Sequence, residues 1–185
     1  MRRDTEISPP GPVSPAWLER AALHYLERYS ASTEMLRRTL ARRVDKRARA
    51  RGEDPAAFAE MIAATVARAV SAGLVDDARF ADARLATLRR RGTSSRGASA
   101  KLAAKGVSRA VVEAAMRAER EAMPEAADID AQAARAYAKR RRLGPYRRPD
   151  TRALHRDRDL AALARAGFSY DLARRAIDAE PDEQG

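Results

Sequence analysis

One segment of the chain, from Gly73 to Val107, has partial copies on both sides of it. It reads Gly-Leu-Val-Asp-Asp-Ala-Arg-Phe-Ala, then Leu-Arg-Arg-Arg-Gly, and later Leu-Ala-Ala-Lys-Gly-Val. An upstream copy over residues 26–43 keeps the same spacing of leucines and basic residues, and a downstream copy over residues 161–169 matches the second half. The repetition predicts one small unit used three times, with basic edges that suit a surface lying along something long.

The composition favours helices for these units. Gly and Pro number nine each in 185 residues, alanine is abundant, and few stretches alternate as strands do. Apolar residues recur at helical spacing between candidate Ser, Thr or Asp caps and closing glycines. They predict helices over about 15–29, 54–73, 126–142, 151–166 and 169–179. Four more are predicted to begin at Ser32 or Thr33, at Asp76 or Asp77, at Ser94 or Ser95 and at Ser108, and to end near residues 51, 91, 105 and before the boundary at 123. We therefore expect an all-α protein of about nine helices in three tandem three-helix repeats, elongated and able to curve.

The glycines and prolines between the predicted helices divide the chain into five parts. The predicted parts are a flexible leader over 1–14, repeats over 15–73, 74–123 and 124–179, and an acidic tail over 180–185. The leader is rich in proline and has no helical periodicity. Each repeat alone has a thin core, so neighbours must share buried surface. Bending is expected near residues 122–127 and 144–150.

Basic residues outnumber acidic ones by 37 to 26, which gives a formal net charge of +11. This balance favours polyanionic partners. Basic side chains also offset the dipole at helix ends, and that explains about half of each run. It does not explain why two repeats carry an arginine run at the same place. The candidate partner- or DNA-binding residues are Arg89, Arg90, Arg91, Arg96, Lys101, Lys105, Lys139, Arg140, Arg141, Arg142, Arg38 and Arg42.

Aromatic residues are sparse, which weakens a mode of DNA binding based on stacked bases. Trp17, Phe58, Phe80 and Phe168 occupy apolar-periodic positions and are expected in the core. Contact with phosphates or with an acidic protein surface therefore fits the basic runs better than base reading.

The sequence offers little for catalysis. No glycine-rich phosphate loop is present, and His24 and His155, the two histidines, fall in different repeats. Asp76, Asp77, Asp128 and Asp130 would suit a magnesium ion, as in a nuclease, but their places at helix starts favour capping of backbone N–H groups. We expect no enzyme activity, no cofactor and no bound metal, with a nuclease as the alternative to be excluded.

The chain has no cysteine, no apolar run long enough to cross a bilayer and no signal peptide. These features predict a cytoplasmic protein without a membrane partner. A monomer is the default expectation.

The central segment resembles the RecX family of recombination regulators. The resemblance rests on residues 73–81, on Arg90-Arg91-Gly92 and on residues 102–107. Residues 137–145 and 160–177 resemble the third part of the family pattern. The first part fits at Leu36 to Leu40 but departs at Met35, where the family pattern has an acid.

The resemblance implies a non-catalytic regulator that binds the RecA recombinase as a filament on single-stranded DNA. It implies inhibition of strand exchange, ATP hydrolysis and coprotease function, and so a part in recombinational repair and the SOS response. The residues themselves leave an alternative open, a general basic DNA-binding protein of helix-turn-helix or architectural type.

Overall fold

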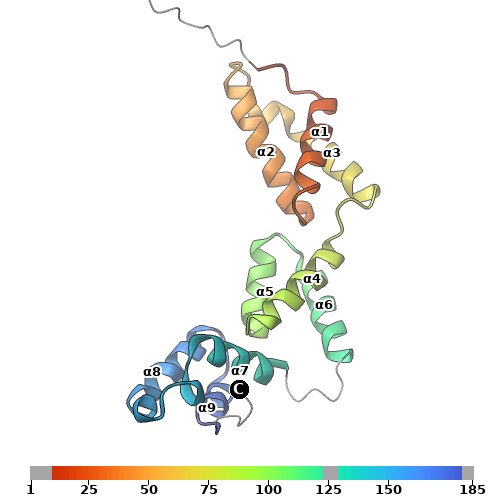
Figure 1. Cartoon of the computed structure of the whole chain (residues 1–185). Helices are drawn as coiled ribbons and strands as arrows, with labels where there is room; N and C mark the ends of the chain where they lie inside the picture. Colours follow the sequence, from red (N-terminus) through yellow and green to blue (C-terminus); the bar gives the residue numbers. More distant parts are fainter. Residues whose placement is uncertain (1–9, 123–128, 181–185) are drawn as a thin grey trace, which may run out of the picture. The chain divides into compact units, whose positions relative to one another are not determined.

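The computed structural model describes residues 10–122 and 129–180 (Figure 1). Over these ranges it contains nine α-helices, three short 3-10 helices and no strand. The helices are α1 (Pro15–Leu26), α2 (Thr33–Arg49), η1 (Pro55–Phe58), α3 (Ala59–Ser71), α4 (Asp77–Arg90), α5 (Ser95–Ala104), α6 (Arg109–Glu121), α7 (Ile129–Arg141), η2 (Gly144–Tyr146), η3 (Pro149–Thr151), α8 (Arg152–Arg165) and α9 (Tyr170–Ile177). The prediction of an all-α protein is confirmed. Its elongation stays a prediction.

Serine side chains fix where most of the helices begin. Each accepts a hydrogen bond from the backbone N–H three residues further on, as an N-cap does, and contributes about 1 kcal/mol. The capping residues are Ser14, Ser32, Ser94, Ser108 and Ser169. The predicted starts of α1, α2, α5 and α6 are thus confirmed, and Ser169 caps α9 in the same way.

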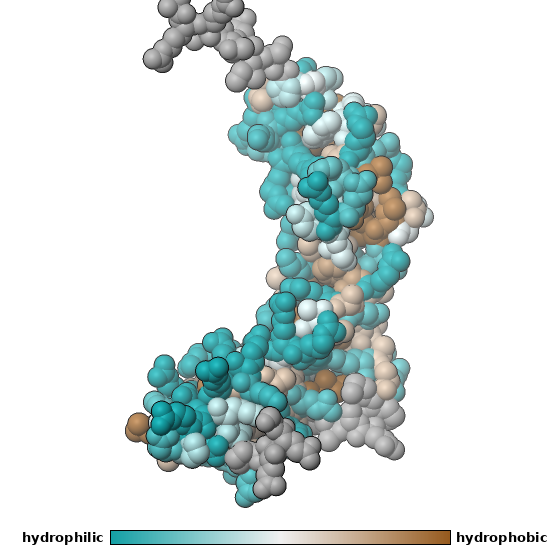
Figure 2. All heavy atoms as spheres, in the orientation of Figure 1, coloured by the Kyte–Doolittle hydropathy of each residue, from teal (hydrophilic) through white to brown (hydrophobic). Residues whose placement is uncertain are grey.

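The contacts divide the chain into two compact units, one up to residue 80 and one from residue 81. The first unit holds α1, α2 and α3 around the fully buried Leu18, Leu36 and Leu40. In the second unit, α7, α8 and α9 enclose Leu163 and Phe168. We call α1–α3, α4–α6 and α7–α9 repeats one, two and three; their exact boundaries as domains stay predictions. Most of the visible surface is hydrophilic, as the composition requires (Figure 2).

The segment just before α1 is packed against repeat one. Val13 is buried in its core, and the backbone oxygens of Pro10 and Gly11 accept hydrogen bonds from Arg51 and Arg47 of the second-helix region. We expected a flexible leader as far as residue 14. The part of it that the structure describes, residues 10–14, is instead held against repeat one, because the side chain of Val13 is buried in the core. We call these five residues the strap.

The connection between α7 and α8 is held by a buried carboxylate. Asp159 of α8 is 1 % exposed and accepts hydrogen bonds from the backbone N–H of Gly144 at 2.9 Å and from both Nε and Nη2 of Arg147 at 2.7 and 2.8 Å. We expected bending over residues 144–150, and the sequence did not predict these contacts. They fix the connection to α8, since a buried charge needs such partners.

Asp159 should make stability depend on acid. Burial raises its pKa, but the Arg147 guanidinium and the Gly144 amide outweigh burial and hold the pKa below its usual value. The stabilisation is therefore present above the unfolded pKa of about 4 and is lost as pH falls through the lower, folded value. Asp159→Asn should cost about 2 kcal/mol at pH 7 and progressively less below pH 4. Urea unfolding of both proteins across this range tests it; a gap that does not change with pH would contradict the assignment.

Candidate basic interface

The first arginine of the central run lies inside the protein. The side chain of Arg89 is 13 % exposed, and it donates to Glu119 of α6 at 2.8 Å and to Asp130 of α7 at 2.9 Å. It also donates to the hydroxyl of Ser95 on α5 at 2.8 Å. One guanidinium thereby joins α4 to three other helices, and its donors are used within repeats two and three.

The helix-start aspartates act as caps, and two of them cap a neighbouring helix. Asp76 accepts from the backbone N–H three residues on, in α4 itself, at 3.0 Å. Asp77 instead accepts from the N–H of Thr33 at the start of α2, at 2.7 Å, and Asp130 accepts from that of Ser95 at the start of α5, at 2.8 Å. The same contact therefore recurs, from the first turn of one repeat to the second helix of the repeat before it. Asp128 lies outside the described residues.

The turn after α4 lies directly on α7. Gly92 has φ +69°, and a Cβ added there would lie 2.7 Å from the backbone oxygen of Ala133 and closer still to the backbone nitrogen of Tyr137. A second contact joins the same repeats, because the hydroxyl of Ser94 donates to the backbone oxygen of Ala166 at the end of α8, at 2.7 Å. Repeat two thus meets repeat three through backbone and small side chains, with no room for a larger residue at position 92.

This close approach gathers exposed arginines from three helices around the joint. Arg90 ends α4, where it donates to the hydroxyl of Thr87 at 3.2 Å, and Arg91 follows in the turn before Gly92. α5 contributes one residue, whose Cβ lies 3.6 Å from a Cβ placed on Gly167. The end of α7 contributes two guanidinium groups, 5.9 and 5.5 Å from the ring centroid of Tyr137. We call these five residues the junction surface: Arg90, Arg91, Arg96, Arg140 and Arg141.

The other predicted basic residues of repeats two and three are exposed but placed differently. Lys101 and Lys105, the residue that follows the end of α5, lie about 140° and 180° round the helix axis from Arg96. Lys139 and Arg142 flank the junction arginines of α7, and Arg142 has a left-handed backbone with φ +54°. The five arginines thus lie exposed beside the joint between repeats two and three, while the two lysines lie on another side of α5.

The two predicted binding residues of α2, Arg38 and Arg42, contact side chains of their own helix. Arg38 and Arg37 share the carboxylate of Glu34, each at 2.6 Å, and Arg42 donates to the hydroxyl of Thr39 at 3.2 Å. The pKa of Glu34 is lowered to about 2, mainly by the hydrogen bond from Arg37 and in addition by the one from Arg38. Part of the positive charge of repeat one is therefore balanced locally, as the helix-surface interpretation of these runs anticipated.

The sequence is similar to that of known proteins. The family model for the second three-helix domain of RecX matches residues 76–116. The regulatory protein RecX of Myxococcus xanthus is 43 % identical over 93 % of this chain and 90 % of its own length. The regulatory protein RecX of Agrobacterium fabrum is 28 % identical over 91 % of this chain and 85 % of its own. No solved structure matches the chain significantly.

The chain belongs to the RecX family. The resemblance noted at residues 73–107 is thus confirmed, and the residues matched by the family model include the arginine run, Gly92 and the lysines of α5. In the described part of this RecX-family chain, no group of three or more carboxylates or histidines is placed to hold a metal ion. Nor does any helix of that part combine the length and apolarity needed to cross a bilayer.

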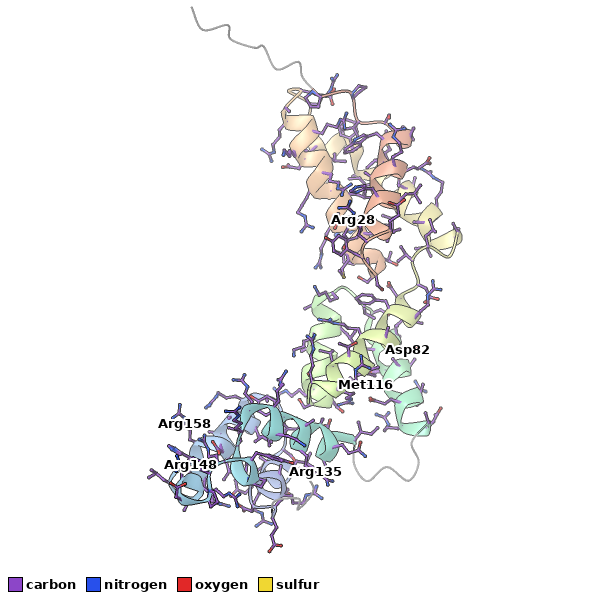
Figure 3. The ribbon with its side chains drawn as sticks, in the orientation of Figure 1. Arg28, Asp82, Met116, Arg135, Arg148 and Arg158 are labelled. Carbon is purple, nitrogen blue, oxygen red and sulfur yellow. The ribbon has the colours of Figure 1, made fainter. Side chains whose placement is uncertain are left out.

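The twelve candidate residues leave out exposed arginines of repeat three and the aromatic ring beside two others in this RecX-family protein. Arg148 is 85 % exposed, and Figure 3 marks it and Arg158 on repeat three. The ring of Tyr137 lies beside the guanidinium groups of Arg140 and Arg141, at 5.9 and 5.5 Å from its centroid. The spacing of three and four residues from Tyr137 to Arg140 and Arg141 was the available signal, because residues so spaced share a helix face.

Proposed function

We propose that this protein is a non-catalytic regulator that binds the RecA recombinase as a filament on single-stranded DNA. In this role it modulates the filament, mostly by inhibiting ATP hydrolysis, strand exchange and coprotease activity in recombinational repair and the SOS response. The proposal takes its partner from membership of the RecX family. The observation that carries it is the junction surface, where arginines of α4, α5 and α7 lie exposed around one joint.

The chemistry of that surface suits phosphates. Arginine presents several N–H donors to an anion, and five exposed arginines on one joint attract a polyanion by adding weak contacts. Arg140 and Arg141 are also preorganised by the Tyr137 ring, which lowers the entropy that they lose on binding. Any partner with closely spaced negative charges along its length gains from this arrangement.

Reversing three junction charges should abolish most of the binding. The variant Arg91→Glu, Arg96→Glu, Arg141→Glu should lower affinity for RecA filaments by about 100-fold and reduce the slope of log K against log salt by about 2. The measurements are co-sedimentation with filaments on single-stranded DNA and inhibition of RecA ATP hydrolysis.

A triple reversal on α6 gives the matched control. Arg109, Arg117 and Arg120 are exposed in the same unit, so their replacement by Glu changes the net charge equally. Equal losses in both variants would mean that net charge alone drives binding and would remove the junction surface from the proposal. Binding of the unaltered protein to bare DNA as tight as to the filament would favour the general DNA-binding alternative.

A further inference from the structure

Repeat one has a groove with an apolar floor, apart from the junction surface. It lies between α2 on one side and η1 with α3 on the other and has a volume of about 510 Å³. Val44 and Ile62 are buried at its floor, while Ala59 and Ala63 of α3 form an exposed wall. This volume falls in the range of sites that bind ligands and is large enough for several apolar side chains.

The groove follows the helices lengthwise. Its lining on α2 runs from Arg37 to Asp45, a rise of about 12 Å, or roughly two turns. The facing wall runs from Pro55 to Ala63. A groove of this length and composition fits a short helix or an extended segment that inserts two or three side chains, as in known helix-in-groove recognition.

The rim of the groove has an excess of positive charge. Arg37 and Arg38 share one carboxylate, that of Glu34, so the group keeps a net positive charge. Arg42 is exposed on the rim, and its hydrogen bond to Thr39 is to a neutral hydroxyl. A partner that places negative charges over these arginines is therefore favoured by charge complementarity.

One rim carboxylate is already balanced. Asp45 lies in the lining but forms an ion pair with Arg49 at 2.8 Å. The pair is exposed, so it contributes little free energy, but it leaves no net negative charge at that end of the groove. The electrostatic preference of the groove is thus set by Arg37 and Arg42.

We infer that the α2–α3 groove docks a segment of a partner protein that carries both acidic and apolar side chains. A nucleic acid strand satisfies the arginines but has no group for the aliphatic floor, and the lining holds no aromatic ring on which a base would stack. This assignment rests on the proposed function and refines it: repeat one grips protein, and the junction surface grips phosphate.

The absence of cysteine from the chain makes a site-specific test direct. Single substitutions Ala63→Cys in the groove and Ala100→Cys near Arg96 are each coupled to a benzophenone photocrosslinker. Ala64→Cys, exposed and about 100° further round α3, is the matched control. Each conjugate is irradiated with purified RecA filaments assembled on a fluorescent oligonucleotide.

The Ala63 conjugate is expected to couple to RecA, several times more than the Ala64 conjugate, while the Ala100 conjugate couples to the oligonucleotide. Mass spectrometry of the Ala63 adduct should identify a peptide with acidic and apolar residues. Coupling from Ala63 to the oligonucleotide, to a basic peptide, or at no more than the control level would overturn the inference, while the Ala100 coupling would keep the proposed function standing. No coupling from any conjugate, with no co-sedimentation, would remove both.

Discussion

Replacing Gly92 with alanine should destabilise the second unit by about 4 kcal/mol, since backbone strain and overpacking act at the same residue. Gly92 has φ +69°, a left-handed conformation that costs a residue with a Cβ. The added carbon would also meet the backbone of Ala133 and Tyr137 on α7, and a helix backbone cannot rotate away as a side chain can. Hydrogen exchange read peptide by peptide should show faster exchange in repeats two and three and unchanged exchange in α1–α3.

Gly73 and Gly52 provide controls that share the conformation but not the contact. Their φ values are +67° and +71°, and a Cβ at either would meet nothing within 4 Å. Gly73→Ala and Gly52→Ala should therefore cost only the left-handed term, about 1 kcal/mol. If Gly92→Ala cost no more than these two, the turn after α4 would not be packed on α7, and the junction surface would lose its structural basis.

The sequence was a good guide to the helices because their signals are local. A serine caps the helix that begins beside it, and a glycine closes the helix that ends before it, so neither depends on distant residues. The strap over residues 10–14 was missed because its stability comes from Val13 in a core built by other segments. Asp77 was correctly read as a cap, but the helix that it caps begins at Thr33, which only the fold brings near.

The basic site was harder to predict, because consecutive arginines look alike in a sequence. On a helix they point about 100° apart, so a run of three must send its members in different directions. The structure turns Arg89 inward to Glu119 and Asp130 and leaves Arg90 and Arg91 exposed. Only the fold places the arginine run at the end of α4 near α7, because Gly92 is packed against residues that lie far from it in the sequence.

Substitution by methionine should affect stability at Arg89 and binding at Arg91. Arg89→Met keeps the apolar stem but removes the guanidinium from between two largely buried carboxylates, and it should destabilise the second unit by about 3 kcal/mol. Arg91→Met should change stability by less than about 0.5 kcal/mol and lower filament affinity about fivefold at low salt. Urea unfolding and filament co-sedimentation, both at fixed salt, measure the two effects separately.

Neutralising Glu119 and Asp130, the two carboxylates that pair with Arg89, distinguishes a structural from a binding role for Arg89. In the variant Arg89→Met, Glu119→Gln, Asp130→Asn, the amide oxygen at position 130 can still accept from the N–H of Ser95. The cap of α5 is therefore kept while the two negative charges that paired with Arg89 are removed. Much of the lost stability should return, and filament affinity should return with it, because the junction arginines are again held in place. Restored stability without restored affinity would instead show that Arg89 itself contacts the partner, and that the joint opens to release it.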